Sequence, residues 1–392
     1  MNSTLLNVFR EDGSLSIGIG DIETGEIKII RDGACCAQYV SGGHIVYHVG
    51  DGSGQVVAVP FDERVGQIAG PPVDIFPPIR FRSIYVSQDG TLLRNEGGSA
   101  PNEKLIWLSV DGTEEDLGLA EIDIRGLSLS PDGKIAAVQT PNEQEGFHDI
   151  VLVDLETGTR NRLTFNGFST FPAWSADGLF VYYEGRDRRA TGQGIYRKLA
   201  DLSANEEFVL PEAGDPNLST DGNWLAYRDG LGESNLSILD LQNDVSLVVD
   251  SAATRQDQPA ISPDSRYVAF RSQHAGQDEV YVRSLAGTGF WSISSGPGSM
   301  PNWSPDGNYI YFIGEQWSMW RVRVTTTPSF QRISSPEIIR GQSGQLRYSV
   351  DQTTGRILMG TRGGRLENME SELLNIVLNF PKELARIAPP SR

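Results

Sequence analysis

Short apolar stretches separated by polar turns follow one another along almost the whole chain. Around Ser130 an apolar stretch leads into an Asp-Gly turn, and further apolar runs follow after a polar loop and a second tight turn. The predicted strands cover residues 127–129, 134–138, 150–155 and 160–164. An Asp-Gly turn between apolar runs is a strong hairpin signal, because Gly readily takes positive φ and Asp bonds to its own backbone. The pattern therefore predicts a unit of four antiparallel strands, with no helix before the C-terminal tail.

The same turn recurs at a regular interval. Two weaker copies begin at Ser41 and Val350, and six copies read Ser-x-Asp followed by Gly or Ser. These six begin at Ser87, Ser130, Ser175, Ser219, Ser262 and Ser304. First positions lie 42 to 46 residues apart, and four strands at this period are typical of a β-propeller blade. We therefore expect an all-β fold, a β-propeller of four-stranded blades, in which the turn aspartates form hairpins and do not bind calcium.

Eight turns predict eight blades, with seven or six as alternatives. Residues 346–350 and 357–359 begin a last blade that lacks an obvious outer pair of strands. Residues 15–19 and 26–30 have the pattern of two outer strands. The N- and C-terminal strands are therefore expected to share one blade and to close the ring, which leaves no strand edge exposed.

The repeat covers nearly the whole chain, so a single propeller domain is expected over residues 1–380. Residues 381–392 form a short tail, in which 381–388 are predicted to be helical. Leu384 and Ile387 can share one face of that helix, and two prolines end it. With the tail outside the ring, replacing Leu384 by Asp is expected to cost less than about 1.5 kcal/mol.

The composition and charge of the chain limit the kinds of molecule that it is expected to bind. The net charge of −18 disfavours nucleic acid and anionic membranes and suits a soluble, acidic protein. The chain has no apolar run of about 18 residues and no charged start followed by an apolar stretch. We therefore expect no membrane insertion and, in the chain as written, no signal peptide. Cys35 and Cys36 are adjacent, and neighbours on a strand point to opposite faces, so no disulfide is expected between them.

Motifs for catalysis and cofactor binding are missing from the sequence. It contains no Gly-x-Ser-x-Gly elbow, no P-loop and no dinucleotide fingerprint. His44 and His48 lie four strand positions apart, about 13 Å, which is too far for one metal ion. We therefore expect no catalytic residue, no metal site and no cofactor.

A candidate ligand-binding site follows from the repeat itself. The innermost strand of each propeller blade begins near one mouth of the central channel, four or five positions before the turn. Aligning the repeats places Arg82, Arg125, Thr170, Asp215 and Asp257 there, and neighbouring loops add Arg186, Arg188, His148, His274 and Trp317. Arginines would gather on one arc of this mouth and aspartates on another, which suits an extended peptide or a zwitterionic ligand. The alternative is that these groups only cap loops and bind water.

The blades with Ser-Pro-Asp-Gly turns resemble the TolB-type, PD40-repeat propellers. The blocks at residues 39–47, 57–62, 70–73, 107–112, 163–165, 279–283 and 375–380 resemble, in the same order, the propeller region C-terminal to the kinase domain of many bacterial eukaryote-like serine/threonine kinases. No kinase motif is present, so phosphoryl transfer is not implied. The resemblance implies a sensor or interaction propeller, often outside the cytoplasmic membrane.

Two functions from different classes remain open at this point. The first is a non-catalytic scaffold, expected to be a monomer, which binds a protein, peptide or glycan. The second is an enzyme, a carbohydrate or peptide lyase or hydrolase, with its site at the mouth of the central channel. Converging His and carboxylate groups would favour the enzyme, and a channel lined by mixed polar residues would favour the binding module. The compartment is left open: cytoplasmic as written, or extracytoplasmic for a fragment of a kinase-type or TolB-type protein.

Overall fold

The computed structural model describes residues 3–10, 15–49, 55–76, 84–87, 90–96, 103–141, 148–187, 192–230, 234–251, 254–287, 289–341, 347–362 and 373–389. Strands dominate these residues, which confirms the all-β fold class. No helix among them is long and apolar enough to cross a membrane. Where the sequence predicts one domain, the contacts separate two compact units, one of described residues from 3–96 and 373–389 and one from 103–141 and 148–362.

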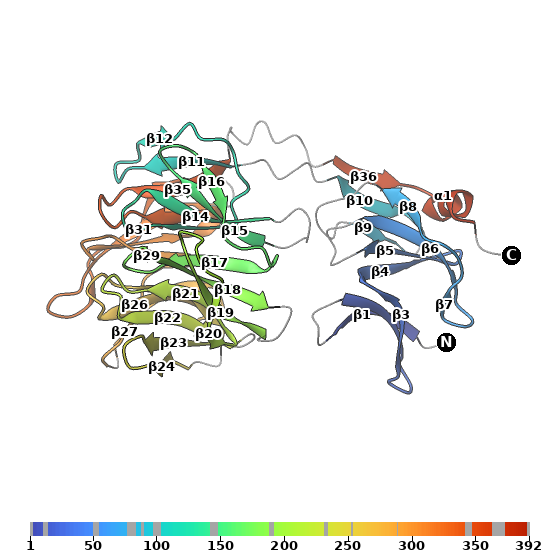
Figure 1. Ribbon diagram of the computed structural model, residues 1–392, viewed down its shortest axis with the longest axis horizontal. Coiled ribbons are helices and arrows are strands. Elements are labelled where there is room, and N and C mark those ends of the chain that lie inside the picture. The colour runs from blue at the N-terminus through green and yellow to red at the C-terminus, as the bar shows by residue number, and fades with distance from the viewer. Residues whose placement is uncertain are drawn as a thin grey trace. The chain divides into compact units, whose positions relative to one another are not determined.

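The second unit consists of six antiparallel sheets (Figure 1). The first blade is β13 (Gly126–Leu129), β14 (Ile135–Pro141), β15 (His148–Asp154) and β16 (Arg160–Arg162). The second is β17 (Ser169–Trp174), β18 (Phe180–Asp187), β19 (Gly192–Leu199) and β20 (Glu207–Pro211). The third is β21 (Ala213–Leu218), β22 (Trp224–Asp229), β23 (Asn235–Asp240) and β24 (Val245–Asp250). The fourth is β25 (Gln256–Ile261), β26 (Tyr267–Ser272), β27 (Glu279–Ser284) and β28 (Phe290–Ser292).

The last two sheets depart from this simple order. The fifth blade contains β29 (Ser299–Trp303), β30 (Tyr309–Ile313) and β31 (Met319–Thr325), and both β32 (Gln331–Arg332) and β33 (Glu337–Arg340) pair with β31. A 3-10 turn, η1 (Glu315–Trp317), joins β30 to β31. The sixth blade combines β34 (Arg347–Val350) and β35 (Ile357–Arg362) with β11 (Glu103–Leu108) and β12 (Glu114–Asp116), in the order β12-β11-β35-β34.

This sixth blade closes the ring differently from the expected way. Ile357 lies opposite Leu108 and Arg362 opposite Glu103, so β35 pairs with β11 and not with residues 15–19. Buried apolar clusters lie between each blade and the next, including between the sixth blade and both the fifth and the first. The described residues of this unit thus form a closed ring of six blades, the smallest number considered from the sequence.

The repeated turns have one hydrogen-bond pattern. The turn serine donates from Oγ to the aspartate Oδ1 two residues later, at 2.7 Å in Ser130–Asp132 and 2.6 Å in Ser304–Asp306. The same Oγ accepts the backbone N–H five residues on, that of Tyr309 at 2.9 Å from Ser304. These bonds confirm that the aspartates shape hairpins.

Tryptophans just before two of these turns join neighbouring blades. Trp174 Nε1 donates to the carbonyl of Ser128 at 3.2 Å, and Trp303 Nε1 donates to that of Ala260 at 2.9 Å. Each bond runs from one innermost strand to the previous one, so the indoles fix the spacing of adjacent blades.

The first unit has three sheets and the helix. Its strands are β1 (Ser3–Phe9), β2 (Leu15–Asp21) and β3 (Ile27–Asp32); β4 (Ala34–Val40), β5 (His44–Val49), β6 (Val56–Asp62), β7 (Gln67–Ile68) and β8 (Val73–Phe76); and β9 (Ile84–Val86), β10 (Leu92–Glu96) and β36 (Leu373–Val377). The helix is α1 (Phe380–Ile387).

The tail is helical as predicted, but it is not peripheral to its unit. Leu384 is fully buried and packs in one cluster with Val40, Val46 and Leu92. His44 Nε2 lies 2.7 Å from the carbonyl oxygen of Ala388 and joins β5 to the end of the helix. The expectation of a mild Leu384→Asp effect is therefore corrected, because the side chain belongs to the core of the first unit.

Candidate functional site

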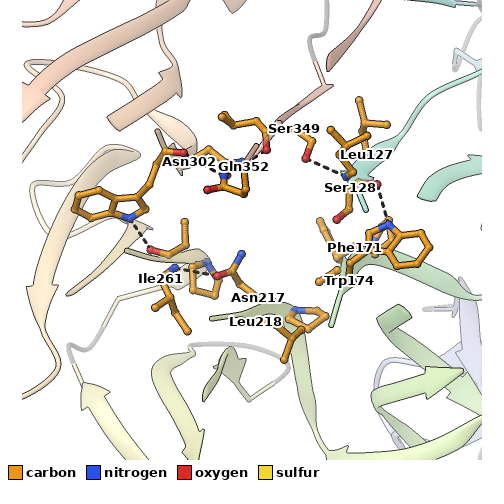
Figure 2. Close-up of a pocket in the computed structure, with 18 of the residues that line it drawn as sticks. Leu127, Ser128, Phe171, Trp174, Asn217, Leu218, Ile261, Asn302, Ser349 and Gln352 are labelled. Atoms are coloured by element: carbon orange, nitrogen blue, oxygen red, sulfur yellow. Dashed lines mark hydrogen bonds between the residues drawn. The ribbon is translucent and has the colours of Figure 1, made fainter. Parts of the chain in front are cut away.

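The innermost strands of the six blades line one cavity of about 610 Å³ at the centre of the second unit. It extends along these strands from Arg125 and Arg347 at their first residues to Pro131 and Gln352 in the turns. Figure 2 shows labelled residues from successive blades, among them Ser128, Asn217 and Asn302, around an open centre. The wall alternates polar and apolar side chains.

Four successive blades share an unusual backbone at one level of this wall. Phe171, Asp215, Gln258 and Met300 each precede a proline and have φ of 54°, 49°, 53° and 53°. The pairing of the strand with its neighbour shifts at each of these positions, which is the signature of a β-bulge. Non-glycine residues rarely adopt positive φ, and such strain persists only where surrounding structure enforces it.

Hydrogen bonds between blades hold these bulges. The backbone N–H of Met300 donates to Gln258 Oε1 at 2.8 Å, and that of Gln258 donates to Asp215 Oδ2 at 3.3 Å. The Phe171 N–H donates to Gln139 Oε1 at 3.1 Å. From the third blade to the fifth, the bulge residue of one blade therefore positions that of the next. We call the four bulge residues Phe171, Asp215, Gln258 and Met300 the bulge belt.

Asp215 is the ionisable residue of this belt, and its pKa is shifted far from the ordinary value. Its side chain is 5% exposed, and Arg228 Nε lies 3.6 Å from Oδ2 while Arg228 Nη2 donates to Glu184 Oε2 at 2.7 Å. The other oxygen, Oδ1, is buried and has no hydrogen-bond partner in the part of the chain that the structure describes. Burial, and then the nearby Asp257 carboxylate, raise the pKa of Asp215 to about 7. Asp215 therefore changes protonation near neutral pH.

Asp257, on the neighbouring blade, forms closer ion pairs than Asp215 does. Its Oδ2 accepts from Arg271 Nη2 at 2.5 Å and lies 2.6 Å from Arg255 Nε, and its side chain is 1% exposed. Arg271 also contacts Asp278 at 3.2 Å. Of the two aspartates expected on this arc, Asp215 lines the cavity and Asp257 is not among its lining residues, and arginines balance much of the charge of both.

Arg125, from the predicted arginine arc, is also paired with a carboxylate. Arg125 Nε lies 2.8 Å from Asp123 Oδ1, and Arg347 Nε donates to the Arg125 carbonyl at 2.7 Å. Burial lowers the pKa of Arg347 and also that of His148, which lies near Arg125. The separation of charge between the two arcs is thus weaker than residue types alone predict.

Other predicted site residues lie apart from the cavity wall. Thr170 is the second residue of its bulged strand and lies opposite Glu184. His274 is exposed, with its ring 5.5 Å from that of Phe290, and Trp317 is 38% exposed in η1. Arg186 is half-buried in β18, and His148 and His274 belong to different blades. Arg82 and Arg188 fall outside the described residues.

Aligning the repeats missed Gln258, Met300 and Arg347, which line the same cavity as Asp215. The missed signal is a proline three positions before the turn, found in four consecutive repeats. Among the residues whose placement is described, no group of three His, Cys, Asp or Glu side chains could hold a metal ion.

Comparisons with known proteins agree on the fold. No family model matches the chain. An uncharacterized protein of Agrobacterium fabrum is 28% identical over 260 residues, which cover 60% of this chain and 85% of that protein. A putative TolB from Agrobacterium tumefaciens is similar in structure, with a TM-score of 0.55, 14% identity and coverage of 68% of this chain and 100% of that chain. TolB from Acinetobacter baumannii gives a TM-score of 0.47 at 16% identity, over 77% of this chain and 79% of that chain. The chain has a TolB-type β-propeller fold, as the resemblance predicts.

Proposed function

We propose that the chain is a non-catalytic interaction module that takes an extended segment of a protein or peptide at the mouth of its central channel. The observation that carries the proposal is the bulge belt, which places an aromatic, a carboxylate, an amide and a thioether at one level of a single cavity. Binding sites in proteins combine apolar walls with a few fixed polar groups in this way.

Phe171 is the apolar anchor of this proposal. Its ring is 42% exposed although the residue lines the cavity. Met300 and the four prolines extend the apolar wall, and methionine adapts to irregular partners. Aromatic groups in such positions commonly dominate the binding energy of an interface.

Asp215 supplies the polar specificity. Among the described residues its buried Oδ1 has no hydrogen-bond partner, so a cationic or N–H-rich group of a ligand that enters the belt can satisfy it. A lysine, an arginine or a free amino terminus in the bound segment meets this requirement. Because the pKa of Asp215 is about 7, such a ligand should bind more tightly as pH rises from about 6 to 8.

The test uses a random peptide library selected against the full chain, followed by calorimetry with the selected peptides. Asp215→Asn and Phe171→Ala are each expected to weaken binding about tenfold or more, the cost of losing a charged hydrogen bond or an aromatic anchor. Gln352→Ala, which alters the turn end of the same cavity, is the matched control and should leave binding unchanged.

Two results would contradict the proposal. In the first, selected peptides bind the folded Asp215 and Phe171 variants as well as they bind the original chain. In the second, the chain chemically converts the selected peptides, and Asp215→Asn abolishes turnover; the enzyme alternative would then hold, with Asp215 as the proton acceptor. A glycan array on the same variants distinguishes a carbohydrate ligand from a peptide.

A further inference from the structure

The two cysteines of the chain lie in a β-bulge of the first unit. Cys35 in β4 lies opposite His48, and the pairing then shifts so that Gln38 lies opposite Val46. Cys36 has a φ of 60°, in the left-handed region. The strand alternation assumed from the sequence is therefore interrupted between these two residues.

As a result, the two side chains approach each other. The Sγ atoms of Cys35 and Cys36 are 2.7 Å apart. The expectation that they point to opposite faces is corrected, because that rule holds only for regular strand backbone. Closing a disulfide would need the sulfurs to approach by about 0.7 Å, to a bond length of about 2.0 Å.

Access to the pair is unequal. Cys35 is 1% exposed, whereas Cys36 is half-buried and can be reached from solvent. The backbone N–H of Cys36 donates to Asn7 Oδ1 at 2.7 Å, which anchors the bulge to β1. The Cys36 thiol can therefore react with a small reagent, while the buried Cys35 thiol lies next to it in a fixed position.

We propose that Cys35 and Cys36 are a redox modification site, a vicinal dithiol that oxidises reversibly to a disulfide with a low-molecular-weight disulfide as oxidant. The Cys36 thiolate attacks the reagent's disulfide bond, forms a mixed disulfide and releases one thiolate of the reagent. The Cys35 thiolate then attacks the Cys36 sulfur and releases the second thiolate. Two protein thiols and one disulfide reagent thus become one protein disulfide and two reagent thiols.

The same geometry makes the product easy to reduce. The peptide bond between the two residues is trans, so their Cα atoms are separated by about 3.8 Å. Ordinary disulfides join Cα atoms about 4.4–6.8 Å apart, and departures from that range store strain and favour reduction. Strained disulfides are typically the labile, regulatory ones.

The experiment incubates the full chain with glutathione disulfide and follows its intact mass and a peptide map. The expected product has lost two hydrogen masses, with both cysteines in one peptide, and dithiothreitol restores the original mass. Cys35→Ser should stop at the glutathione adduct on Cys36, because the resolving thiol is gone. Cys36→Ser should react far more slowly, because Cys35 is buried.

A second probe does not depend on oxidation. Phenylarsine oxide bridges two neighbouring thiols, so one equivalent should bind the original chain and resist a monothiol competitor. Neither serine variant should retain it under that competition. The proposal is overturned if the original chain keeps both thiols in glutathione disulfide, stops at a stable glutathione adduct, or forms only disulfides between chains.

Discussion

At the scale of single residues, the channel wall depends on positive-φ backbone conformations that residues other than glycine rarely adopt. Four non-glycine residues with positive φ recur at one position of consecutive blades. Three of them, Phe171, Gln258 and Met300, donate their backbone N–H to a side chain of the preceding blade. With one oxygen Asp215 therefore accepts a hydrogen bond from the backbone of the next blade, and its other oxygen has no partner among the described residues.

The raised pKa of Asp215 predicts how stability depends on pH. The ordinary carboxyl titrates near 3.8 and this one near 7, with Glu184, Arg228 and Asp257 as its charged neighbours. Between these values the folded protein holds a proton that the unfolded chain releases, so stability falls as pH rises through that window and stays reduced above it. Asp215→Asn should remove this term and raise the free energy of unfolding at about pH 8 by a few kcal/mol at most, on the order of the pKa shift.

Urea unfolding at about pH 5 and pH 8 measures this effect. Asp132→Asn is the control, since the Ser130 hydroxyl lowers the pKa of Asp132 and its contribution is lost only in acid. An Asp215→Asn variant that keeps the original difference between the two pH values would show that Asp215 stays ionised throughout.

At the scale of elements, α1 is a structural part of the first unit. Its buried face carries Phe380 and Leu384, and its end is bonded to His44 in β5. A helix of eight residues has little stability of its own, so this packing is what maintains it.

Leu384→Asp should therefore lower the free energy of unfolding by about 3 kcal/mol or more, because a charge would replace a fully buried side chain. Ala385→Asp introduces the same residue at an exposed position of the same helix and should change stability by no more than about 0.5 kcal/mol. Thermal and urea denaturation of the two variants check this difference. Equal, small effects would mean that the helix detaches without loss to the sheets.

Features of the fold that depend on neighbouring residues could be predicted from the sequence, whereas features that depend on residues far apart in the chain could not. The strands and turns follow from local chemistry, since the Asp-Gly hairpins and the apolar runs act within a few residues. The partner of β35 does not, because residues 15–19 and 103–108 offer similar apolar strands and only the packing of whole blades decides between them. Cys36 was misread for a related reason: nothing adjacent to it, neither glycine nor proline, signals positive φ. Asp215 was found by alignment on the turns, whereas its ionisation depends on Arg228 and Asp257, which only the folded blades bring to it.

At the scale of the whole molecule, closure of the six-bladed ring determines which parts fold together. The sixth blade is assembled from both ends of the second unit, β11 with β12 and β34 with β35. Every blade of that unit therefore has an apolar neighbour on both sides, without any strand of the first unit.

A fragment of residues 103–362 should accordingly fold alone and unfold in one cooperative transition. A fragment of residues 103–341, which lacks β34 and β35, keeps β11 paired with β12 but leaves its other edge without β35 and two apolar blade faces uncovered. It should fail to give a sharp thermal transition and should aggregate. Circular dichroism and size-exclusion chromatography of both fragments test the closure, and similar melting curves for the two would contradict it.

The register of that closing pair also has a mechanical consequence. Glu103 and Arg362 lie directly opposite each other in an antiparallel pair, so the polypeptide enters and leaves the ring at one point. A pulling force applied to these two ends loads the β11–β35 hydrogen bonds one after another, as a zipper is opened, rather than all at once in shear. The ring should therefore open at low force under tension across this point, yet resist heat through the apolar layers between all its blades.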